Sequence, residues 1–253
     1  MLAVNRRCCR VWHDQGFTLT ELAVVLVIVS LLIGGLLVPL SAQVDIRSTN
    51  DTRTALAEIR EALLGFAVAN GRLPCPALPS TASGVAGAGL EVAPPLPGAG
   101  CVSLAGVLPW ATLAVSENDA WGRRYSYRVT SAFSRFPVGA ATAGFTLSST
   151  GDLTIRPAKG AALIADRVPA VVISHGKNGN GAYLSQGTQL PVGVDADEQE
   201  NQLTNTAPGV WIDGPVVAEF VKRAAPTATY DDEVVWISPG VLFNRMISAG
   251  KLP

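Results

Sequence analysis

An apolar run close to the N-terminus restricts the folds open to this chain more than any other feature. From Phe17 to Ala42 the only charged residue is Glu21. A helix rises about 1.5 Å per residue, so a helix over this run exceeds the roughly 30 Å hydrocarbon core of a bilayer. The sequence therefore predicts one membrane-spanning helix over residues 17–42.

The residues ahead of this run, 1–16, form a short basic leader. It contains Arg6, Arg7 and Arg10 against a single Asp14. Positively charged residues beside a span stay on the cytoplasmic side. The N-terminus is therefore expected in the cytoplasm, and the chain after the span on the other side of the membrane.

A secretory signal and a plain single-pass anchor each explain only part of this apolar run. A secretory signal has an apolar core of about 7–15 residues and a small-x-small cleavage site, whereas this run is longer and Leu40-Ser41-Ala42 fits such a site poorly. A plain single-pass anchor explains the length of the run. It does not explain the residues at its start, Gly16-Phe17-Thr18-Leu19-Thr20-Glu21.

These six residues, between a basic leader and an unbroken apolar run, resemble the prepilin processing signal of type IV pilins and type II secretion pseudopilins. The resemblance implies that a prepilin peptidase cuts between Gly16 and Phe17 and methylates the new amine of Phe17. It also implies assembly with other pilin or pseudopilin subunits, first in the inner membrane and then in a filament. Thr20 departs from the family, in which this position is often Ile, Leu or Val.

Glu21 is the acidic residue inside the predicted span. A carboxylate in hydrocarbon costs roughly 2.5–3.5 kcal/mol on insertion scales, so it is rarely present without a partner. Glu21 stands one helical turn after Phe17, whose amine cleavage would create. We expect Glu21 to pair with that amine in its own chain or in a neighbouring subunit, where the pair would set the axial register. The alternative is a carboxylate near the cytoplasmic face that reaches water.

Pro39 lies inside the predicted helix, after Gly34 and Gly35. Proline removes a backbone hydrogen bond and clashes with the preceding turn, and each glycine weakens a helix by about 1 kcal/mol relative to alanine. The sequence predicts a helix kink at Pro39, in a segment that the pilin family also tends to soften. The alternative is a kink without consequence, since membrane helices often contain Gly and Pro.

The helix is expected to continue beyond the span as an amphipathic segment, 43–71. Its apolar residues recur at intervals of three and four, which is typical of a helix with one buried face. They are Leu56, Ile59, Leu63, Leu64 and Ala67. Asn70-Gly71 is a suitable stop because glycine tolerates the left-handed conformation that ends many helices. One helix from Phe17 to Asn70 is therefore predicted, followed by a periplasmic globular domain, 72–253.

Two cysteines bracket a Gly-, Ala-, Ser- and Pro-rich loop, 75–101. Cys75 and Cys101 are the only cysteines left after cleavage, because Cys8 and Cys9 leave with the leader. An even pair in an exported domain favours a disulfide. Closing this loop would contribute roughly 3–4 kcal/mol on the chain-entropy model. The alternative is two free thiols.

The rest of the chain has the alternation and turn residues of strands. Predicted strands are Tyr125–Phe133, a hairpin of Gly144–Ser149 with Asp152–Ile155, a continuously apolar strand Val168–Ser174, and Glu233–Ile237. Ser238-Pro239 opens a short C-terminal helix and Gly250 ends it. The expected fold is α+β and pilin-like, with one long N-terminal helix packed on an antiparallel β-sheet and a short C-terminal helix.

The segment from Asp119 to Tyr127, Asp-Ala-Trp-Gly-Arg-Arg-Tyr-Ser-Tyr, is similar to the Asp-x-Trp-Gly-x-x-Tyr-x-Tyr segment of pseudopilins. In that family it is a turn that leads into a strand. The resemblance implies that Asp119 and Gly122 shape the turn and that Trp121 covers the core. A sugar-binding role for Trp121 is the alternative.

A glycine-rich loop, 174–181, resembles the loop that precedes the calcium-binding acids of major pseudopilins. The acids come later here, and the candidate calcium ligands are Asp195, Asp197 and Glu198. Calcium takes six to eight oxygen ligands, which carboxylates and carbonyls can supply. Tyr230-Asp231-Asp232-Glu233 could join this site or cap a turn. A solvated acidic loop is the alternative, and no other cofactor is expected.

The amino-acid composition limits the classes of function open to this chain. Only 15% of residues are charged, against about a quarter in an average soluble domain, which indicates a partly membrane-embedded chain. The net charge is −1, so nucleic acid is not an expected partner. His175 is the only histidine of the mature chain, which argues against a triad and against an enzyme. We expect a structural filament subunit, a minor pilin or pseudopilin. The alternative is a pilin-like tip adhesin or binding module.

Overall fold

The computed structural model describes residues 17–93, 96–140, 142–202 and 218–253, without the side chains of residues 34–42 and 218. The chain divides into two compact units, an N-terminal unit, Met1–Arg47, and a C-terminal unit, Ser48–Pro253. Helix α1, Leu19–Asn70, contributes to both units. The leader and Gly16 lie outside the described residues.

The described part of the N-terminal unit is helical from Leu19 onward. Every described side chain from Phe17 to Ile33 is exposed. Among the residues that the structure describes, no helix is both long enough and apolar enough to cross a membrane. Pro39 falls among the side chains outside the description, so the kink stays a prediction.

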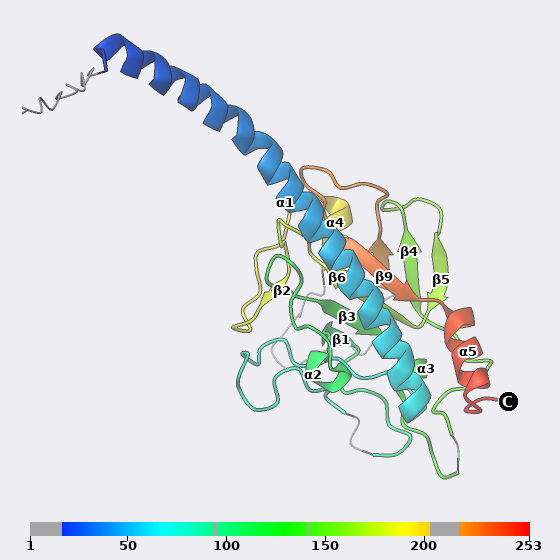
Figure 1. Ribbon diagram of the computed structural model, residues 1–253. Helices are drawn as coiled ribbons and strands as arrows, with labels where there is room; N and C mark the ends of the chain where they lie inside the picture. Colours follow the sequence, from blue (N-terminus) through cyan, green and yellow to red (C-terminus); the bar gives the residue numbers. More distant parts are fainter. Residues whose placement is uncertain (1–16, 94–95, 141, 203–217) are drawn as a thin grey trace, which may run out of the picture. The chain divides into compact units, whose positions relative to one another are not determined.

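A four-stranded antiparallel sheet forms the centre of the C-terminal unit (Figure 1). Its order is β1-β3-β6-β9, with β1 at Ala105–Val107, β3 at Ser126–Val129, β6 at Ala170–Ser174 and β9 at Glu233–Ile237. The predicted strand Glu233–Ile237 has the bounds of β9, and the prediction of an antiparallel sheet is confirmed.

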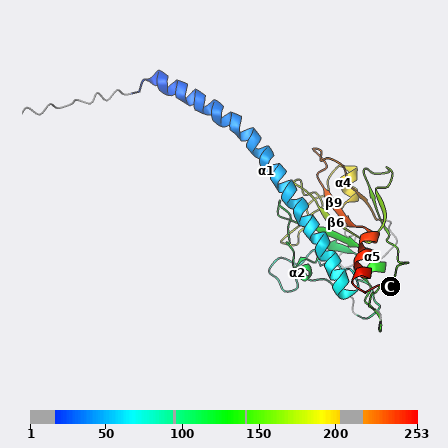
Figure 2. The same cartoon turned by 45° about the vertical axis from the view of Figure 1, so that its right-hand side comes forward.

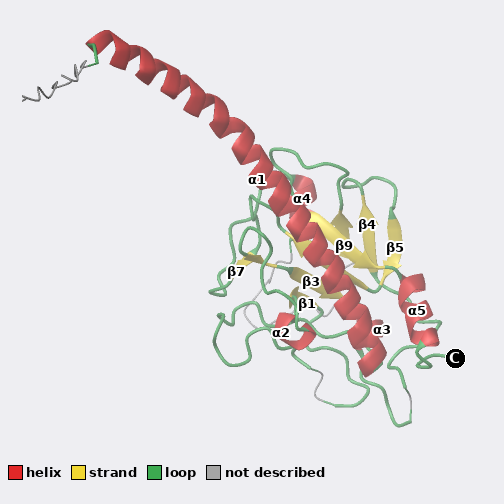
Figure 3. Ribbon diagram, viewed as in Figure 1, coloured by secondary structure: helices red, strands yellow, loops and turns green. Residues whose placement is uncertain are grey.

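Among the described residues of this unit, two smaller sheets and four short helices accompany the four-stranded sheet (Figure 3). One sheet has the order β5-β4-β8 and the other pairs β2 with β7. The strands are β2 (Arg123–Arg124), β4 (Leu153–Arg156), β5 (Ala165–Val168), β7 (Tyr183–Leu184) and β8 (Ala218–Val221); the helices are α2 (Trp110–Leu113), α3 (Ser131–Ser134), α4 (Ala196–Glu200) and α5 (Pro239–Ser248).

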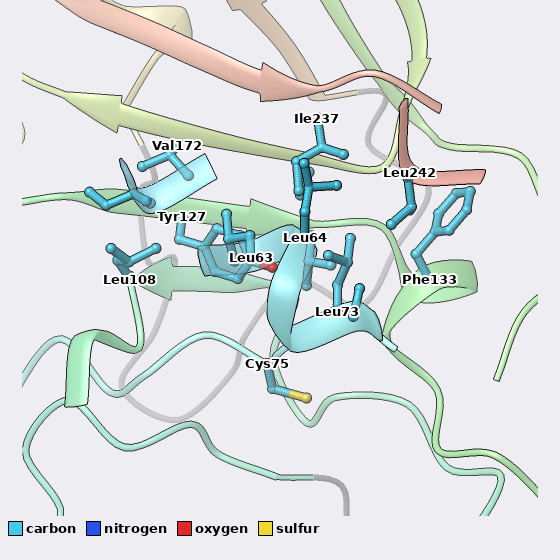
Figure 4. Close-up of a cluster of buried hydrophobic side chains, with 14 of the residues drawn as sticks. Leu63, Leu64, Leu73, Cys75, Leu108, Tyr127, Phe133, Val172, Ile237 and Leu242 are labelled. Carbon is cyan, nitrogen blue, oxygen red and sulfur yellow. The ribbon is translucent and has the colours of Figure 1, made fainter. Parts of the chain in front are cut away.

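The C-terminal half of α1 packs its apolar stripe against one face of the four-stranded sheet (Figure 4). Leu63 and Leu64 point toward Tyr127, Val172 and Ile237, and all five side chains are almost completely buried. The amphipathic pattern of the sequence correctly identified this stripe. Burial of leucine side chains at about 25 cal/mol per Å² makes this cluster a main source of stability for the unit.

Helix α5 closes the same core beside α1 (Figure 2). Leu242 and Met246 are completely buried in it, and Arg245 donates to Glu61 of α1 at 2.9 Å. Ser238 occupies the N-cap and Pro239 the first helical position, as predicted, although the Ser238 side chain makes no capping hydrogen bond. The prediction of a short C-terminal helix is confirmed.

The opposite face of the four-stranded sheet packs on β4, β5 and β8. Val171 and Ile173 of β6 bury there against Ile155 and Phe220, whereas Ala170 and Val172 face α1. A strand that is covered on both faces has no solvent-exposed face that would favour polar side chains. This explains why the sequence of β6 is continuously apolar rather than alternating.

The predicted hairpin is wrong. Gly144–Ser149 forms a turn instead of a strand, in which Ser149 Oγ accepts from Thr146 N at 3.0 Å. Strand β4 pairs antiparallel with β5 and parallel with β8, at positions such as Ile155 with Phe220. Both edges of β4 are therefore occupied by strands from elsewhere in the chain, and no edge is left for the predicted partner.

Two predicted strands are shorter than expected. The strand starting near Tyr125 ends at Val129, because α3 begins at Ser131. The predicted strand Val168–Ser174 is divided between the end of β5 and all of β6. Pro169 separates them, since it has no N–H to contribute to a ladder.

Candidate functional site

Thr18 and Glu21 form a capping box at the start of α1. Thr18 N donates to Glu21 Oε2 at 2.8 Å, and Glu21 N donates to Thr18 Oγ1 at 3.3 Å. This reciprocal pattern satisfies amide groups that the first turn of a helix otherwise leaves unpaired. In the uncleaved chain the Glu21 carboxylate therefore has a local partner, and pairing with the amine of Phe17 stays a prediction.

Polar groups of the described apolar segment are satisfied within the helix. Ser30 Oγ donates to Leu26 O at 2.7 Å, a local bond that needs no tertiary neighbour. Phe17 is 82% exposed, at the point where the predicted cleavage would create the new terminus. The described part of the segment, Phe17–Ile33, thus presents an almost entirely apolar surface with no core of its own.

A buried polar cluster is the second candidate site, and it lies in the C-terminal unit. Three chain segments contribute to it: the loop after β6 with His175, α4 with Glu198, and the residues before β9, Asp231 and Asp232. Gly176 has φ +57°, and a Cβ there would lie 2.4 Å from Asp231 O. Only glycine allows this loop to approach Asp231 so closely.

One carboxylate oxygen each of Glu198, Asp231 and Asp232 can be chosen so that all three lie within 4.8 Å of one another. Asn178 Nδ2 donates to Glu198 Oε1 at 2.5 Å, and Asn180 Nδ2 donates to Glu198 Oε2 at 2.8 Å. Amide groups therefore hold both oxygens of the fully buried Glu198. This set of acids is a candidate for a hard divalent cation.

Burial dominates the electrostatics of the cluster. It raises the pKa of Asp231 and raises the pKa of Asp232 well above its usual value, and the neighbouring carboxylates act in the same direction. Burial also lowers the pKa of His175 to about 4, helped by the charge of Arg123. His175 is therefore neutral at pH 7, and the cluster is a place where negative charge is unfavourable without a cation or a proton.

The same cluster contains a serine, a histidine and an aspartate in a row. Ser126 Oγ lies 2.8 Å from His175 Nε2, and His175 Nδ1 lies 3.7 Å from Asp232 Oδ1. None of the three residues is more than 5% exposed, and Ser126 lies within β3 rather than on an exposed turn. A substrate has no access to this serine, so the row is a structural network rather than catalytic machinery.

The three predicted calcium ligands are not brought together. Asp195 accepts from Arg223 Nη2 at 2.9 Å and Asp197 accepts from Arg223 Nε at 2.7 Å, whereas Glu198 faces Asp231 and Asp232. Although burial opposes it, hydrogen bonds from Thr229 and the Asp197 amide, together with Arg223, lower the pKa of Asp195. We call Asp195 and Asp197 the outer pair. Arg223 already neutralises their charge, and no residue near Asp195 in the sequence predicted this pairing.

The turn from Asp119 to Gly122 has the form that the sequence predicted. Asp119 Oδ1 accepts from Trp121 N at 2.9 Å and from Arg123 N at 3.0 Å, while Asp119 Oδ2 accepts from Ser174 Oγ at 2.6 Å. Gly122 has φ +78°. Asp119 thus connects the turn to the end of β6, and Trp121 is half-buried.

Cys75 and Cys101 are joined by a disulfide across 26 positions of sequence. The enclosed loop has no helix or strand in its described residues. Arg72 holds its start, because its guanidinium donates to Glu91 at 2.8 and 2.9 Å and stacks over Phe136. The disulfide and the Arg72–Glu91 ion pair thus hold this loop in place without a helix or strand in its described residues.

The comparisons with known proteins add one finding. Residues 13–37 match the prokaryotic N-terminal methylation motif, the leader signal of type IV pilins and pseudopilins. No curated protein and no solved structure matches the chain. The chain therefore carries this leader signal on an α+β fold, which implies processing by a prepilin peptidase, a membrane-anchored precursor and assembly with pilin-type subunits. Proteins with this motif are structural rather than catalytic.

Proposed function

We propose that this chain is a structural filament subunit, a minor pilin or pseudopilin of a type IV pilus or type II secretion system. The observation that carries the proposal is the methylation motif at residues 13–37. In this proposal a prepilin peptidase cuts after Gly16 and methylates Phe17, residues 17–42 anchor the subunit in the inner membrane, and the C-terminal unit is periplasmic.

The exposure of the N-terminal segment supports this proposal. Apolar side chains such as Leu19 at 85% and Leu31 at 71% exposure form a surface that is unstable in water. Lipid would cover that surface before assembly, and helices of neighbouring subunits would cover it in the filament. The Thr18–Glu21 capping box keeps the first turn satisfied in either setting.

The size of the mature chain favours a minor subunit. Residues 17–253 are long for a bulk subunit and suit a low-abundance or tip component. The described residues of the C-terminal unit contain three buried apolar clusters and a disulfide, so this unit has a core of its own. A position at or near the filament tip leaves room for such a large domain.

A tip adhesin is the second candidate, on a specific observation. The disulfide-bracketed loop exposes Val85 at 56%, Leu90 at 52% and Leu96 at 67%. Apolar side chains held on a stapled loop are suited to contact another surface. The aromatic side chains described in the C-terminal unit are buried or half-buried, so this candidate rests on aliphatic contacts rather than on sugar stacking.

Mass spectrometry of the protein purified from membranes tests the proposal. The expected N-terminus is N-methyl-Phe17, and Gly16→Leu should leave the precursor uncut. Co-purification of the wild-type chain with other pilin subunits should accompany cleavage. An intact Met1, or cleavage after Ala42, would contradict the proposal. Cell adhesion that is lost on Leu96→Asp with assembly intact would favour the adhesin.

A further inference from the structure

We propose that the outer edge of β9 binds one extended segment of another protein, in which an acidic residue stands next to an apolar one. The segment adds a strand to the four-stranded sheet by bonding to the backbone of Trp236, and its acidic side chain lies beside Arg60 and Lys222. This interaction goes beyond the proposed filament function and does not depend on it.

Strand β9 is the last strand of its sheet, so β6 occupies only one of its edges. Backbone groups of an antiparallel strand point alternately to its two sides. Thr130 N donates to Pro169 O at 2.8 Å, so the Pro169 carbonyl points toward β3 and the backbone of Ala170, the next residue, points toward β9. Ala170 is opposite Ile237. Ile237 therefore bonds to β6, whereas Trp236, one residue earlier, directs its N–H and C=O to the outer edge.

A contact of Lys222 supports this direction. Lys222 Nζ donates to Val234 O at 2.9 Å, and Val234 stands two residues before Trp236, so the backbone groups of both point to the same side. Among the described residues, none makes a hydrogen bond with the backbone N–H or C=O of Trp236. Unpaired groups on an edge strand are a template for a further strand. Lys222 closes the edge at Val234, so pairing begins at Trp236.

Two hollows flank the outer edge of β9. One, of about 280 Å³, lies on the α1 side of the sheet and is lined by Leu64 of α1 and Val241 of α5. The other, of about 440 Å³, lies beside β5 at the start of α5 and is lined by Pro239 and Phe243. Trp236 lines both hollows. Side chains of an added strand point alternately to the two faces, so neighbouring residues of the segment reach different hollows.

The charges of the two hollows determine which side chain each accepts. Arg60 and Lys222 line the hollow on the α1 side, and none of the described residues that line it is acidic. Arg60 is 47% exposed, and its contact with Glu61 is long, at 3.9 Å. In the other hollow Arg167 pairs with Asp166 at 3.5 Å, so these charges cancel. An acidic side chain therefore fits the first hollow and an apolar one the second.

A second copy of this chain fits the edge poorly. Pairing of two β9 strands edge to edge brings the Lys222 side chain of each copy to the shared edge, where like charges repel. Lys222 also occupies the Val234 carbonyl, which such a pairing needs. A segment with an acidic residue at this place replaces the repulsion by attraction, so a partner of different sequence is favoured.

Fluorescence anisotropy and hydrogen exchange on the full-length chain in detergent test the proposal. The probe is a labelled, end-blocked peptide, Thr-Thr-Glu-Leu-Thr-Thr, in which the acidic and the apolar residue are adjacent. It should bind to the wild type. At saturation, hydrogen exchange of residues 234–238 should slow by about 10-fold, because the Trp236 amide gains a hydrogen-bond partner.

Arg60→Glu should weaken binding of this peptide by about 5- to 10-fold and should favour the same peptide with Lys in place of Glu. Arg135→Glu is the matched control, because it makes the same change of charge on an exposed residue that lines neither hollow. It should bind the peptide as the wild type does. If Arg60→Glu does not fold, Arg60→Gln should weaken binding in the same direction.

Absence of binding by the wild type at about 1 mM peptide would overturn the proposal. So would binding that leaves the exchange of residues 234–238 unchanged, because the contact would then involve no added strand. Equal loss of binding in Arg60→Glu and Arg135→Glu would contradict the assigned place of the acidic side chain. Slow exchange of these residues without peptide, lost on dilution, would assign the edge to a second copy and also overturn the proposal.

Discussion

The two units of this chain differ in the exposure of their apolar side chains. In the N-terminal unit, the described apolar residues from Phe17 to Ile33 are exposed. In the C-terminal unit, the main apolar residues are buried in two clusters on the two faces of one sheet. The described residues of the N-terminal unit therefore form no core of their own, whereas those of the C-terminal unit do.

The same contrast holds for charged groups. Glu21 is satisfied by Thr18, three residues away. In the C-terminal unit, Glu233 accepts from Arg53 across 180 positions, and Asp195 from Arg223 across 28. Local contacts can be recognised in a linear motif, whereas long-range contacts exist only once the chain has folded. Four substitutions, ordered by their expected effect on the stability of the C-terminal unit, test this contrast.

Leu63→Ala should have the largest effect. Leu63 is completely buried between α1 and the sheet, so its truncation should lower the unfolding free energy by about 2–5 kcal/mol. Denaturant unfolding followed by tryptophan fluorescence measures it. Glu58→Ala, on the exposed face of the same helix, is the control and should change stability by less than about 0.5 kcal/mol. Equal effects would mean that this face of α1 is not a core element.

Replacing Cys75 and Cys101 together by serine should cost about 3–4 kcal/mol, because the unfolded chain regains the entropy of an open loop. The same loss should appear in the wild type after reduction. Thiol labelling without reductant should find neither cysteine reactive in the wild type. Reactive thiols in periplasmic protein would contradict the disulfide.

Arg223→Gln should cost about 1–3 kcal/mol, because two largely buried carboxylates lose their counter-ion. The loss is smaller than for a fully buried pair, because the Arg223 side chain is 25% exposed and solvent screens its charge. Thermal unfolding compares it with Arg167→Gln, whose pair with Asp166 is exposed and should matter little. A neutral Arg223→Gln would show that α4 is held by other contacts.

Glu21→Leu should leave the stability of the C-terminal unit unchanged and still remove the chain from filaments. An acid in an apolar segment is costly to leave unpaired but easily replaced by an apolar residue, so cleavage should persist while axial register is lost. Co-purification with pilin subunits at equal cell levels measures incorporation. Thr20→Val is the control and should assemble normally. Undiminished incorporation of Glu21→Leu would favour a plain membrane anchor.

Sequence reasoning succeeded where the signal was local. It placed the helix at Phe17–Asn70 against Leu19–Asn70 in the structure, and strand Glu233–Ile237 with its observed bounds. It failed at the hairpin of Gly144–Ser149, because a turn-rich alternating segment does not reveal that β8 will occupy the edge of β4. Parallel pairing of distant strands leaves no short-range pattern.

The candidate cation site also combines a part that the sequence predicted with a part that only long-range contacts decide. The resemblance of the loop 174–181 to a loop of major pseudopilins suggested an ion near Asp195, and Asp231 and Asp232 were named as residues that could join it. Which acids remain free depends on where Arg223 lies, and Arg223 is 28 positions from Asp195. A pattern of carboxylates cannot distinguish acids that pair with an arginine from acids that remain unpaired.

By itself, the sequence determined the methylation motif at residues 13–37, the apolar segment and the buried stripe of α1. Each depends on neighbours within a few residues, through helical periodicity or a short recognition motif. The tertiary structure alone decided the three-layer packing around β6, the partner of each buried acid and the free oxygens of Asp231 and Asp232. These depend on burial and on contacts between distant segments, which arise only when the chain closes on itself.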